Sequence, residues 1–124
     1  MSKHQNKAIG LFGELLAKKH LIKEGYEIIG QNIREKWGEI DLIASNSREV
    51  IFIEVKTLIQ KSPHSQNLKP EDQMTNFKIQ HLQKSILYYL NKYKIQKDYR
   101  VDLITIELYP RYRKYRLRHY KNIL

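Results

Sequence analysis

Two β-type segments decide the fold of this 124-residue chain, namely GEIDLIA at residues 38–44 and VIFIEVKT at residues 50–57. Aliphatic and β-branched side chains dominate both, which predicts strands over Glu39–Ala44 and Val50–Thr57. The polar residues 45–48 between them are few enough for a hairpin connection. Apolar residues occupy both faces of the second segment, which is typical of a strand in the centre of a sheet.

Two helices and three more strands are predicted around this pair. Apolar residues between Lys7 and Lys23 recur at helical spacing, and Gly25 stands where a glycine commonly ends a helix. The predicted helices are Lys7–Lys23 and Phe77–Tyr93, and the further strands are Tyr26–Arg34, Arg100–Leu108 and a cation-rich, edge-like strand Arg111–Tyr120. The order α-β-β-β-α-β-β predicts an α/β fold in which a mixed central β-sheet is flanked by helices.

Length and composition indicate one soluble domain over residues 1–124, with 41% hydrophobic and 29% charged residues. No apolar run approaches the roughly 18 residues of a membrane span, and no signal peptide is evident, so we expect a cytoplasmic protein without a membrane partner. The absence of cysteine excludes disulfides and thiolate chemistry. Residues 60–76 are polar and contain two prolines, which predicts a long, mobile surface loop.

The charge balance points to a polyanionic partner. The chain has 23 lysines and arginines against 13 acidic residues, a formal net charge of +10, which favours nucleic acid. The alternatives are solubility alone, or ribosome association without chemistry. In the last strand, arginines alternate with tyrosines, which suits either nucleic-acid contact or protection of a sheet edge. The candidate nucleic-acid-binding residues are Lys18, Lys19, Lys78, Arg111, Arg113 and Arg116.

The acidic residues of the two deciding strands form a candidate catalytic site. Glu39 and Asp41 are two residues apart and therefore share a strand face, and so do Glu54 and Lys56. A hairpin would bring these groups together, and clustered carboxylates repel one another unless a cation neutralises them. Mg²⁺ or Mn²⁺ suits such oxygen ligands, and an adjacent lysine can offset charge on a phosphate. The alternative is an ion-pair patch on a solvated face.

The motifs together resemble a known nuclease superfamily. An aspartate followed by an acidic-x-lysine triplet on the next strand is the signature of the PD-(D/E)xK nucleases, which include restriction enzymes and archaeal Holliday-junction resolvases. The chain is more closely similar to the bacterial YraN, or UPF0102, family of predicted endonuclease-like proteins. The matching motifs, which span nearly the whole chain, are Gly13-Glu14, residues 38–44, residues 52–57, Lys78, Arg100-Val101-Asp102 and residues 119–122.

This resemblance implies a restriction-endonuclease-like fold and assigns roles to individual residues. Asp41 and Glu54 would be metal ligands, Lys56 the catalytic lysine, and Glu14 a further acidic residue at the metal. On the residues alone, Glu14 could equally pair with Lys18 at i+4. The family commonly has an arginine where this chain has Leu58, which removes one expected phosphate contact.

The leading functional prediction is a Mg²⁺- or Mn²⁺-dependent endonuclease that acts on DNA rather than RNA, with branched or flapped DNA in repair or recombination as candidate substrates. A homodimer is compatible with this prediction. The alternative is a non-catalytic nucleic-acid-binding module that retained the fold. A metal-independent RNA endonuclease would need a Tyr-His-Lys arrangement that the sequence does not place, and the histidines lack metal-ligand spacing.

Two further residues have a structural and a functional interpretation. Trp37 precedes Gly38 at a predicted turn, where we expect it to cap the sheet, with stacking on a base as the alternative. Asp102 follows the start of a predicted strand, where we expect it to support the core or a neighbouring chain.

Overall fold

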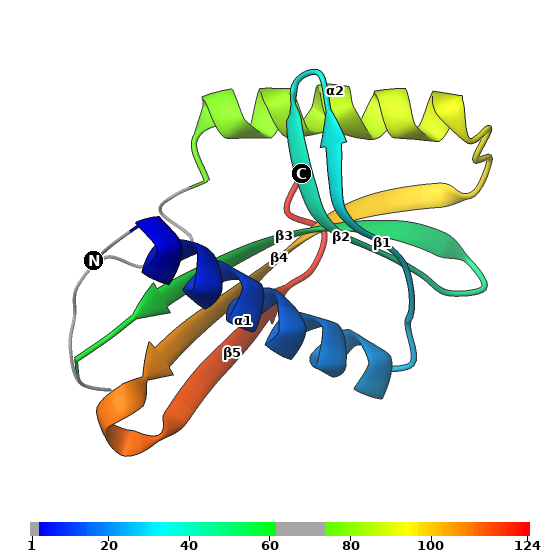
Figure 1. The fold of residues 1–124 in the computed structure, drawn as a ribbon. Helices are drawn as coiled ribbons and strands as arrows, with labels where there is room; N and C mark the ends of the chain where they lie inside the picture. Colours follow the sequence, from blue (N-terminus) through cyan, green and yellow to red (C-terminus); the bar gives the residue numbers. More distant parts are fainter. Residues whose placement is uncertain (1–2, 62–73) are drawn as a thin grey trace.

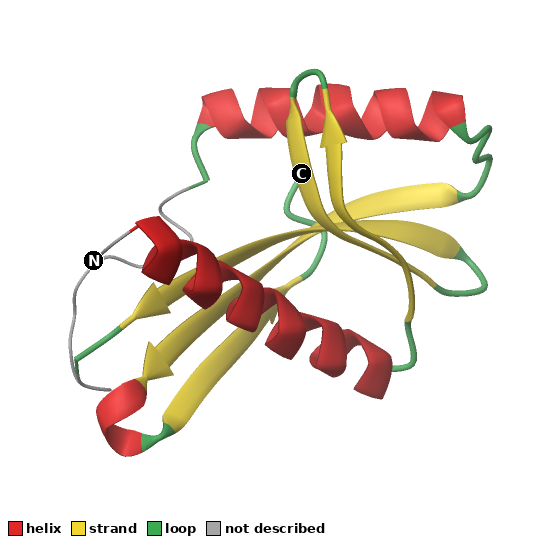
Figure 2. Cartoon of the chain, in the orientation of Figure 1, coloured by secondary structure: helices red, strands yellow, loops and turns green. Residues whose placement is uncertain are grey.

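The computed structural model describes residues 3–61 and 74–124 and has the element order predicted from the sequence. Its elements are α1 (Lys3–Lys23), β1 (Glu27–Glu35), β2 (Gly38–Ser45), β3 (Glu49–Ile59), α2 (Asn76–Lys92), β4 (Asp98–Tyr109), the 3₁₀ turn η2 (Pro110–Tyr112) and β5 (Lys114–Tyr120) (Figures 1 and 2). The α/β class and the α-β-β-β-α-β-β order are therefore confirmed. None of the described helices is long and apolar enough to cross a bilayer.

The five strands form one mixed sheet in the order β1-β2-β3-β4-β5. Neighbouring strands are antiparallel except for β3 and β4, which run parallel from Glu49↔Asp98 to Ile59↔Leu108. A parallel pair needs a crossover connection, and α2 lies in the chain that joins these two strands. The strand that carries the Glu-Val-Lys triplet, β3, is central, as its apolar sequence predicts.

One helix covers each face of the sheet (Figure 1). On the α1 face, Ala17 and Leu21 pack against alternate β3 residues such as Ile51 and Ile53. On the α2 face, Leu82, Ile86 and Tyr89 pack in a second cluster with Ile40, Phe52 and Val101. Each leucine, isoleucine, valine or phenylalanine side chain buried in this way stabilises the fold by roughly 1.5–3 kcal/mol. The two clusters hold both helices against the strands that carry the acidic residues.

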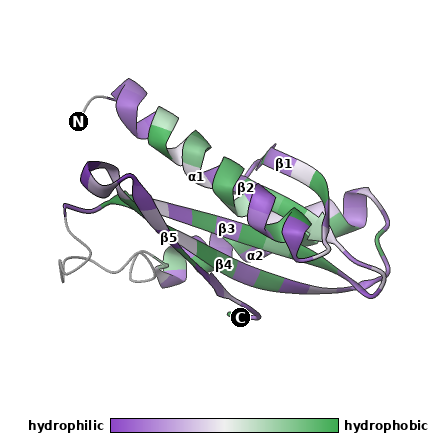
Figure 3. Cartoon of the chain, turned by 90° about the horizontal axis from the view of Figure 1, so that it is seen from below, coloured by the Kyte–Doolittle hydropathy of each residue, from purple (hydrophilic) through white to green (hydrophobic). Residues whose placement is uncertain are grey.

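The contact face of α1 is narrower than the apolar pattern predicts. Its buried residues are Gly13, Ala17 and Leu21, which are spaced by four and form a single stripe. Phe12, Leu15 and other apolar residues of the predicted face remain exposed. Figure 3 shows hydrophobic and hydrophilic residues interleaved along the visible side of α1.

The predicted last strand, Arg111–Tyr120, is wrong in its first three residues. Tyr109 pairs with Lys114, so residues 110–113 form the connection between β4 and β5. Pro110 begins the 3₁₀ turn, and Arg113 adopts a left-handed conformation with φ 52° before the strand resumes. Arg111 and Arg113 therefore lie on a turn, because proline cannot continue a strand ladder.

The predicted loop 60–76 is too long at both of the ends that the structure describes. Gln60 is buried, and its N–H donates to the Leu108 carbonyl at 2.8 Å, which prolongs the parallel pairing by one residue. At the other end, the Thr75 hydroxyl accepts from Lys78 N at 3.2 Å and caps α2, so Asn76 belongs to the helix. Residues 62–73, where the rest of that loop was predicted, lie outside the described residues.

Candidate metal centre

A close helix–strand approach brings α1 to the site. A Cβ atom at Gly13 would lie 1.8 Å from Thr57 Oγ1 and 2.9 Å from Thr57 Cβ, so only glycine allows α1 to lie this near β3. Glu14 follows Gly13 directly, and Thr57 follows Lys56. The contact therefore fixes how far the Glu14 carboxylate stands from the acidic strands.

The pairing of β2 with β3 stops at the position where Asp41 lies. The ladder runs from Ser45↔Val50 to Leu42↔Ile53, and beyond it Val55 N donates to the Asp41 Oδ2 atom at 2.8 Å. Ile40 and Ile43 both pack in the α2-side cluster, although strict alternation would place them on opposite faces. The Asp41 side chain thus takes the place of a backbone acceptor, and this bond fixes the orientation of its carboxylate.

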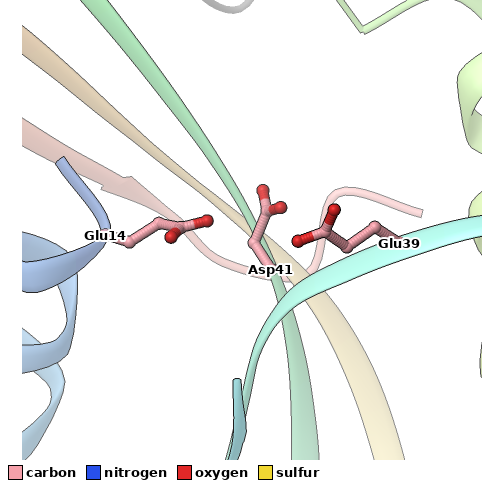
Figure 4. Close-up of side chains that lie close together, drawn as sticks. All are labelled: Glu14, Glu39 and Asp41. Atoms are coloured by element: carbon pink, nitrogen blue, oxygen red, sulfur yellow. The ribbon is translucent and has the colours of Figure 1, made fainter. Parts of the chain in front are cut away.

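Three carboxylates converge at this interruption. Among the described residues, Glu14, Glu39 and Asp41 each offer an oxygen within 4.8 Å of the others. Figure 4 shows the three side chains pointing toward one another, Glu14 from α1 and the other two from β2. Glu14 and Asp41 were predicted at a metal, and Glu39, on the same strand face as Asp41, was predicted to support the ligands, with a salt bridge as the alternative.

Asn32 is a site residue that the sequence did not reveal. With its amide oriented to satisfy both partners, Nδ2 donates to Glu14 Oε1 at 2.9 Å and to Glu39 Oε1 at 2.7 Å. Asn32 adopts φ 50°, and its β1 neighbours Gln31 and Ile33 pair with Leu42 and Ile40 on either side of Asp41. A lone asparagine within a predicted strand was the available signal, since asparagine is depleted in strands and tolerates positive φ.

The electrostatics favour a cation at this cluster. Burial, the neighbouring Glu54 and, more weakly, Glu14 raise the pKa of Asp41 to about 8, against the opposing effects of the Val55 N–H and of Lys56. The pKa of Glu14 is also raised, by burial and by Glu39 and Glu54, although the Asn32 hydrogen bond opposes the rise. Added positive charge would favour the ionised form of both carboxylates. Three oxygen donors suit Mg²⁺ or Mn²⁺.

Glu54 and Lys56 form an ion pair beside the three carboxylates. Lys56 Nζ lies 3.1 Å from Glu54 Oε1, and the two side chains are only 17% and 16% exposed. Glu54 lies outside the close carboxylate group, but its charge contributes to raising the pKa of Asp41. Lys78 lies in the first turn of α2, close enough to Lys56 that the charge of Lys56 lowers the pKa of Lys78. Two cations therefore stand together next to the acidic cluster.

Two pockets meet at this ion pair, and Glu54 and Lys56 line both. The α1 pocket has a volume of about 530 Å³ and is lined by residues that include Asn6, Gly10, Glu14, Asp41 and Thr57. The α2 pocket has a volume of about 260 Å³ and is lined by residues that include Trp37, Glu39, Phe77, Lys78, His81 and Ser85.

The other five predicted nucleic-acid-binding residues line neither of the two pockets. The sequence allowed a pairing of Lys18 with Glu14, but each residue has another partner. Lys18 Nζ donates to Gln31 Oε1 at 3.2 Å, and Glu14 accepts from Asn32. Lys19 is exposed on α1. Arg111 and Arg113 lie on the β4–β5 connection, and the exposed Arg116 lies with its guanidinium carbon 5.9 Å from the Tyr109 ring centroid. Of the six predicted residues, only Lys78 lines the α2 pocket.

Asp102 supports the core through a separate set of hydrogen bonds. It is fully buried and accepts hydrogen bonds from Arg100 Nε at 3.0 Å, His119 Nε2 at 2.7 Å and Asn122 N at 2.9 Å. Because its Nε2 donates, His119 can accept with Nδ1 from His20 Nε2, 3.1 Å away on α1. The motifs around Arg100 and His119 therefore tie β4, β5 and α1 together.

Known proteins are similar in sequence to this chain over most of its length. The profile of the uncharacterised protein family UPF0102 matches residues 13–106, which contain all the residues of the carboxylate cluster. A UPF0102 protein of Clostridium perfringens is 36% identical over 121 residues, covering 97% of this chain and 96% of that protein. UPF0102 proteins of Caldicellulosiruptor bescii and Campylobacter fetus are 39% and 36% identical, covering 81% and 79% of this chain and 82% of each relative. With a match of this extent, the chain belongs to the uncharacterised protein family UPF0102.

Proposed function

We propose that this protein is a Mg²⁺- or Mn²⁺-dependent endonuclease that hydrolyses phosphodiester bonds in DNA, with branched or flapped DNA as the favoured substrates. The observation that carries the proposal is the convergence of Glu14, Glu39 and Asp41 beside the Glu54–Lys56 ion pair. Carboxylates of this kind with an adjacent ammonium are what metal-assisted phosphodiester hydrolysis requires. The net charge of +10 favours a polyanionic substrate.

The residues of the site would have separate roles in this reaction. Glu14, Glu39 and Asp41 would hold the ion, with Glu54 as a further carboxylate beside them. When bound, the ion would supply Lewis-acid activation of the phosphate and of the attacking water. Lys56 would orient that water and offset the negative charge that develops on the phosphorus centre. The hydrogen bond from Val55 N would keep the Asp41 carboxylate in place throughout.

The competing function is a nucleic-acid-binding module without catalysis. Its support is the cationic surface, which would bind phosphates whether or not the carboxylates hold a metal. The complete acidic set favours the enzyme, because a module that only binds gains nothing from buried carboxylates that repel its ligand.

One experiment separates the two functions. Purified protein is incubated with linear duplex, single-stranded, flapped and four-way DNA, with Mn²⁺ or with a chelator. We expect Mn²⁺-dependent cleavage that falls by about 10²–10³-fold in Lys56→Ala, since a lost transition-state contact of this kind costs that much. DNA affinity should change little, because one phosphate contact among several is removed.

Lys84→Ala is the matched control, since it removes the same charge from an exposed position of α2. It should cleave like the unmodified protein. Full cleavage by Lys56→Ala would contradict the assignment of the lysine. Binding of all four DNAs without any cleavage would favour the non-catalytic module.

A further inference from the structure

The α2 pocket combines a small volume with an aromatic rim. Its volume of about 260 Å³ lies just below the roughly 300–1,000 Å³ of sites for drug-sized ligands, which suits a flat group the size of one nucleobase. Phe77 stands at the rim, 68% exposed, with its ring centroid 4.1 Å from that of His81. Trp37, also on the rim, is held edge-on by Tyr88, with the centroids 5.9 Å apart.

Two polar groups of the same pocket can bond to a ligand, namely the Ser85 hydroxyl and one ring nitrogen of His81. The Ser85 hydroxyl is buried and has no hydrogen-bond partner among the described residues, although its residue is only 1% exposed. An unpaired buried hydroxyl is costly, and a ligand that bonds to it would recover that cost. His81 Nδ1 donates to the Trp37 carbonyl at 2.9 Å, which leaves Nε2 of the neutral ring as an acceptor. The edge of a base carries matching donors and acceptors.

Two cations line the pocket. Lys56 and Lys78 both line it, and they are close enough for the charge of one to lower the pKa of the other. Two ammonium groups that repel each other are stabilised by an anion that contacts both. A phosphate at this position would lie next to the ion pair, with its own base directed into the pocket that Phe77 and Trp37 line.

We infer that the α2 pocket binds one unpaired base of a nucleic-acid strand whose phosphate lies against Lys56 and Lys78. The inference deepens the proposed nuclease function and rests on it for the identity of the strand. A paired base cannot enter such a pocket without leaving its helix, and unpairing costs least where the base is already single-stranded. The pocket therefore selects substrates with unpaired nucleotides, such as flaps, gaps and junction arms.

The test uses the full chain in a chelator, so that neither metal nor cleavage contributes. Trp37 is the only tryptophan, and its fluorescence reports occupancy of the pocket. The protein is titrated with deoxyadenosine 5′-monophosphate and, in parallel, with deoxyribose 5-phosphate, which has the same phosphate and sugar without the base. We expect the nucleotide to bind at least about fivefold more tightly, the low end of what base–aromatic stacking contributes. Equal affinities, or no binding of either compound, would overturn the inference.

Variants locate the base within the pocket. Phe77→Ala should reduce the preference for the nucleotide at least about threefold. The matched control is Leu87→Ala, also on α2 and 53% exposed but lining a different cavity, and it should leave the preference unchanged. Ser85→Ala should weaken nucleotide binding and yet raise the melting temperature, because it removes an unpaired buried hydroxyl. The same loss of preference in Phe77→Ala and Leu87→Ala would contradict the assignment.

The outcome is separable from that of the nuclease proposal. Asp41→Asn, which alters the carboxylate cluster, should keep the full preference for the base. Mn²⁺-dependent cleavage without base preference would overturn this inference alone. Base preference without cleavage of any DNA would overturn the nuclease proposal and leave the pocket assignment standing.

Discussion

Replacing Asp41 by asparagine should stabilise the metal-free protein at neutral pH and abolish its response to Mn²⁺. Asparagine keeps an oxygen that can accept the Val55 N–H, which Asp41 binds at 2.8 Å, so the backbone donor stays satisfied. It carries no ionisable proton and cannot repel Glu54 or Glu14. The substitution therefore removes the free-energy cost of keeping Asp41 protonated in the folded state and leaves the geometry of the interrupted ladder in place.

The magnitude follows from the raised pKa of Asp41, about 8 against an ordinary value of 3.8. Between these values the folded state keeps a proton that the unfolded state releases, so stability falls as pH rises through this window and levels off near pH 8. Each pH unit corresponds to 1.36 kcal/mol, which gives at most about 4 kcal/mol at pH 7. Partial solvent access screens the charges and reduces this figure. Asp41→Asn should be more stable than the unmodified protein by a growing margin from pH 5 to pH 8.

Urea unfolding at pH 5, 7 and 8.5 in a chelator measures this margin. Asp98→Asn, an identical exchange at an exposed position where β4 begins, is the control and should show no such pH-dependent gain. With Mn²⁺ at about 100 times its dissociation constant, the unmodified protein should gain about 2.7 kcal/mol and Asp41→Asn nothing. Parallel pH profiles for the two proteins, or equal stabilisation by Mn²⁺, would refute the reasoning.

Three other perturbations test separate parts of the structure. Gly13→Ala should push α1 away from Thr57, at an overpacking cost of about 1–3 kcal/mol against roughly 1 kcal/mol gained in helix propensity, and should weaken Mn²⁺ binding in calorimetry. Gly10→Ala is the control, because its Cβ would meet nothing within 4 Å, and it should only stabilise the protein. Equal Mn²⁺ affinities of Gly13→Ala and Gly10→Ala would contradict the role of Gly13. Asp102→Ala should cost about 3–5 kcal/mol in urea unfolding at pH 7, because Arg100 and His119 lose their buried partner. Burial raises the pKa of Asp102, but the bonds from His119 and Arg100 lower it overall. The stability that this residue contributes should therefore be lost as acid protonates it. A free energy of unfolding that does not change with pH in acid would count against the network. Changing Arg111, Arg113 and Arg116 together to Gln should flatten the salt dependence of DNA binding by two to three units in anisotropy titrations, and an unchanged slope would mean that these residues do not contact phosphate.

Local sequence was sufficient for the number and order of the strands and for part of the site. The continuous apolar run of β3 requires burial on both faces, which correctly predicts its central position. Residues two apart on a strand share a face, which predicts that Glu39 and Asp41 lie together. They do lie close, although strict alternation fails at this point of β2, where Ile40 and Ile43 pack on the same face. The family was also identified correctly from the spacing of its motifs.

Tertiary contacts decided what the sequence could not reveal. Asn32 reaches the carboxylates only because β1 pairs beside Asp41 and bends to a positive φ there. Glu14 has no local feature that separates it from a solvated glutamate, and its placement depends on the fit of Gly13 against Thr57. The course of α1 over the sheet, and hence the exposure of Phe12 and Leu15, depends on the same fit.

The parallel pairing of β3 with β4 also sets an order of events during synthesis. Glu14, Asn32, Glu39, Asp41, Glu54 and Lys56 all precede residue 60, yet β3 gains its second neighbour only when residues 98–109 have been made. Until then β3 is an open edge, and α1 lacks Ile104 and Ile106, which complete the cluster beneath it. Metal affinity that requires a folded site would therefore develop late. A chain still growing on the ribosome, surrounded by nucleic acid, would carry every acidic residue of the site without the arrangement that makes them effective.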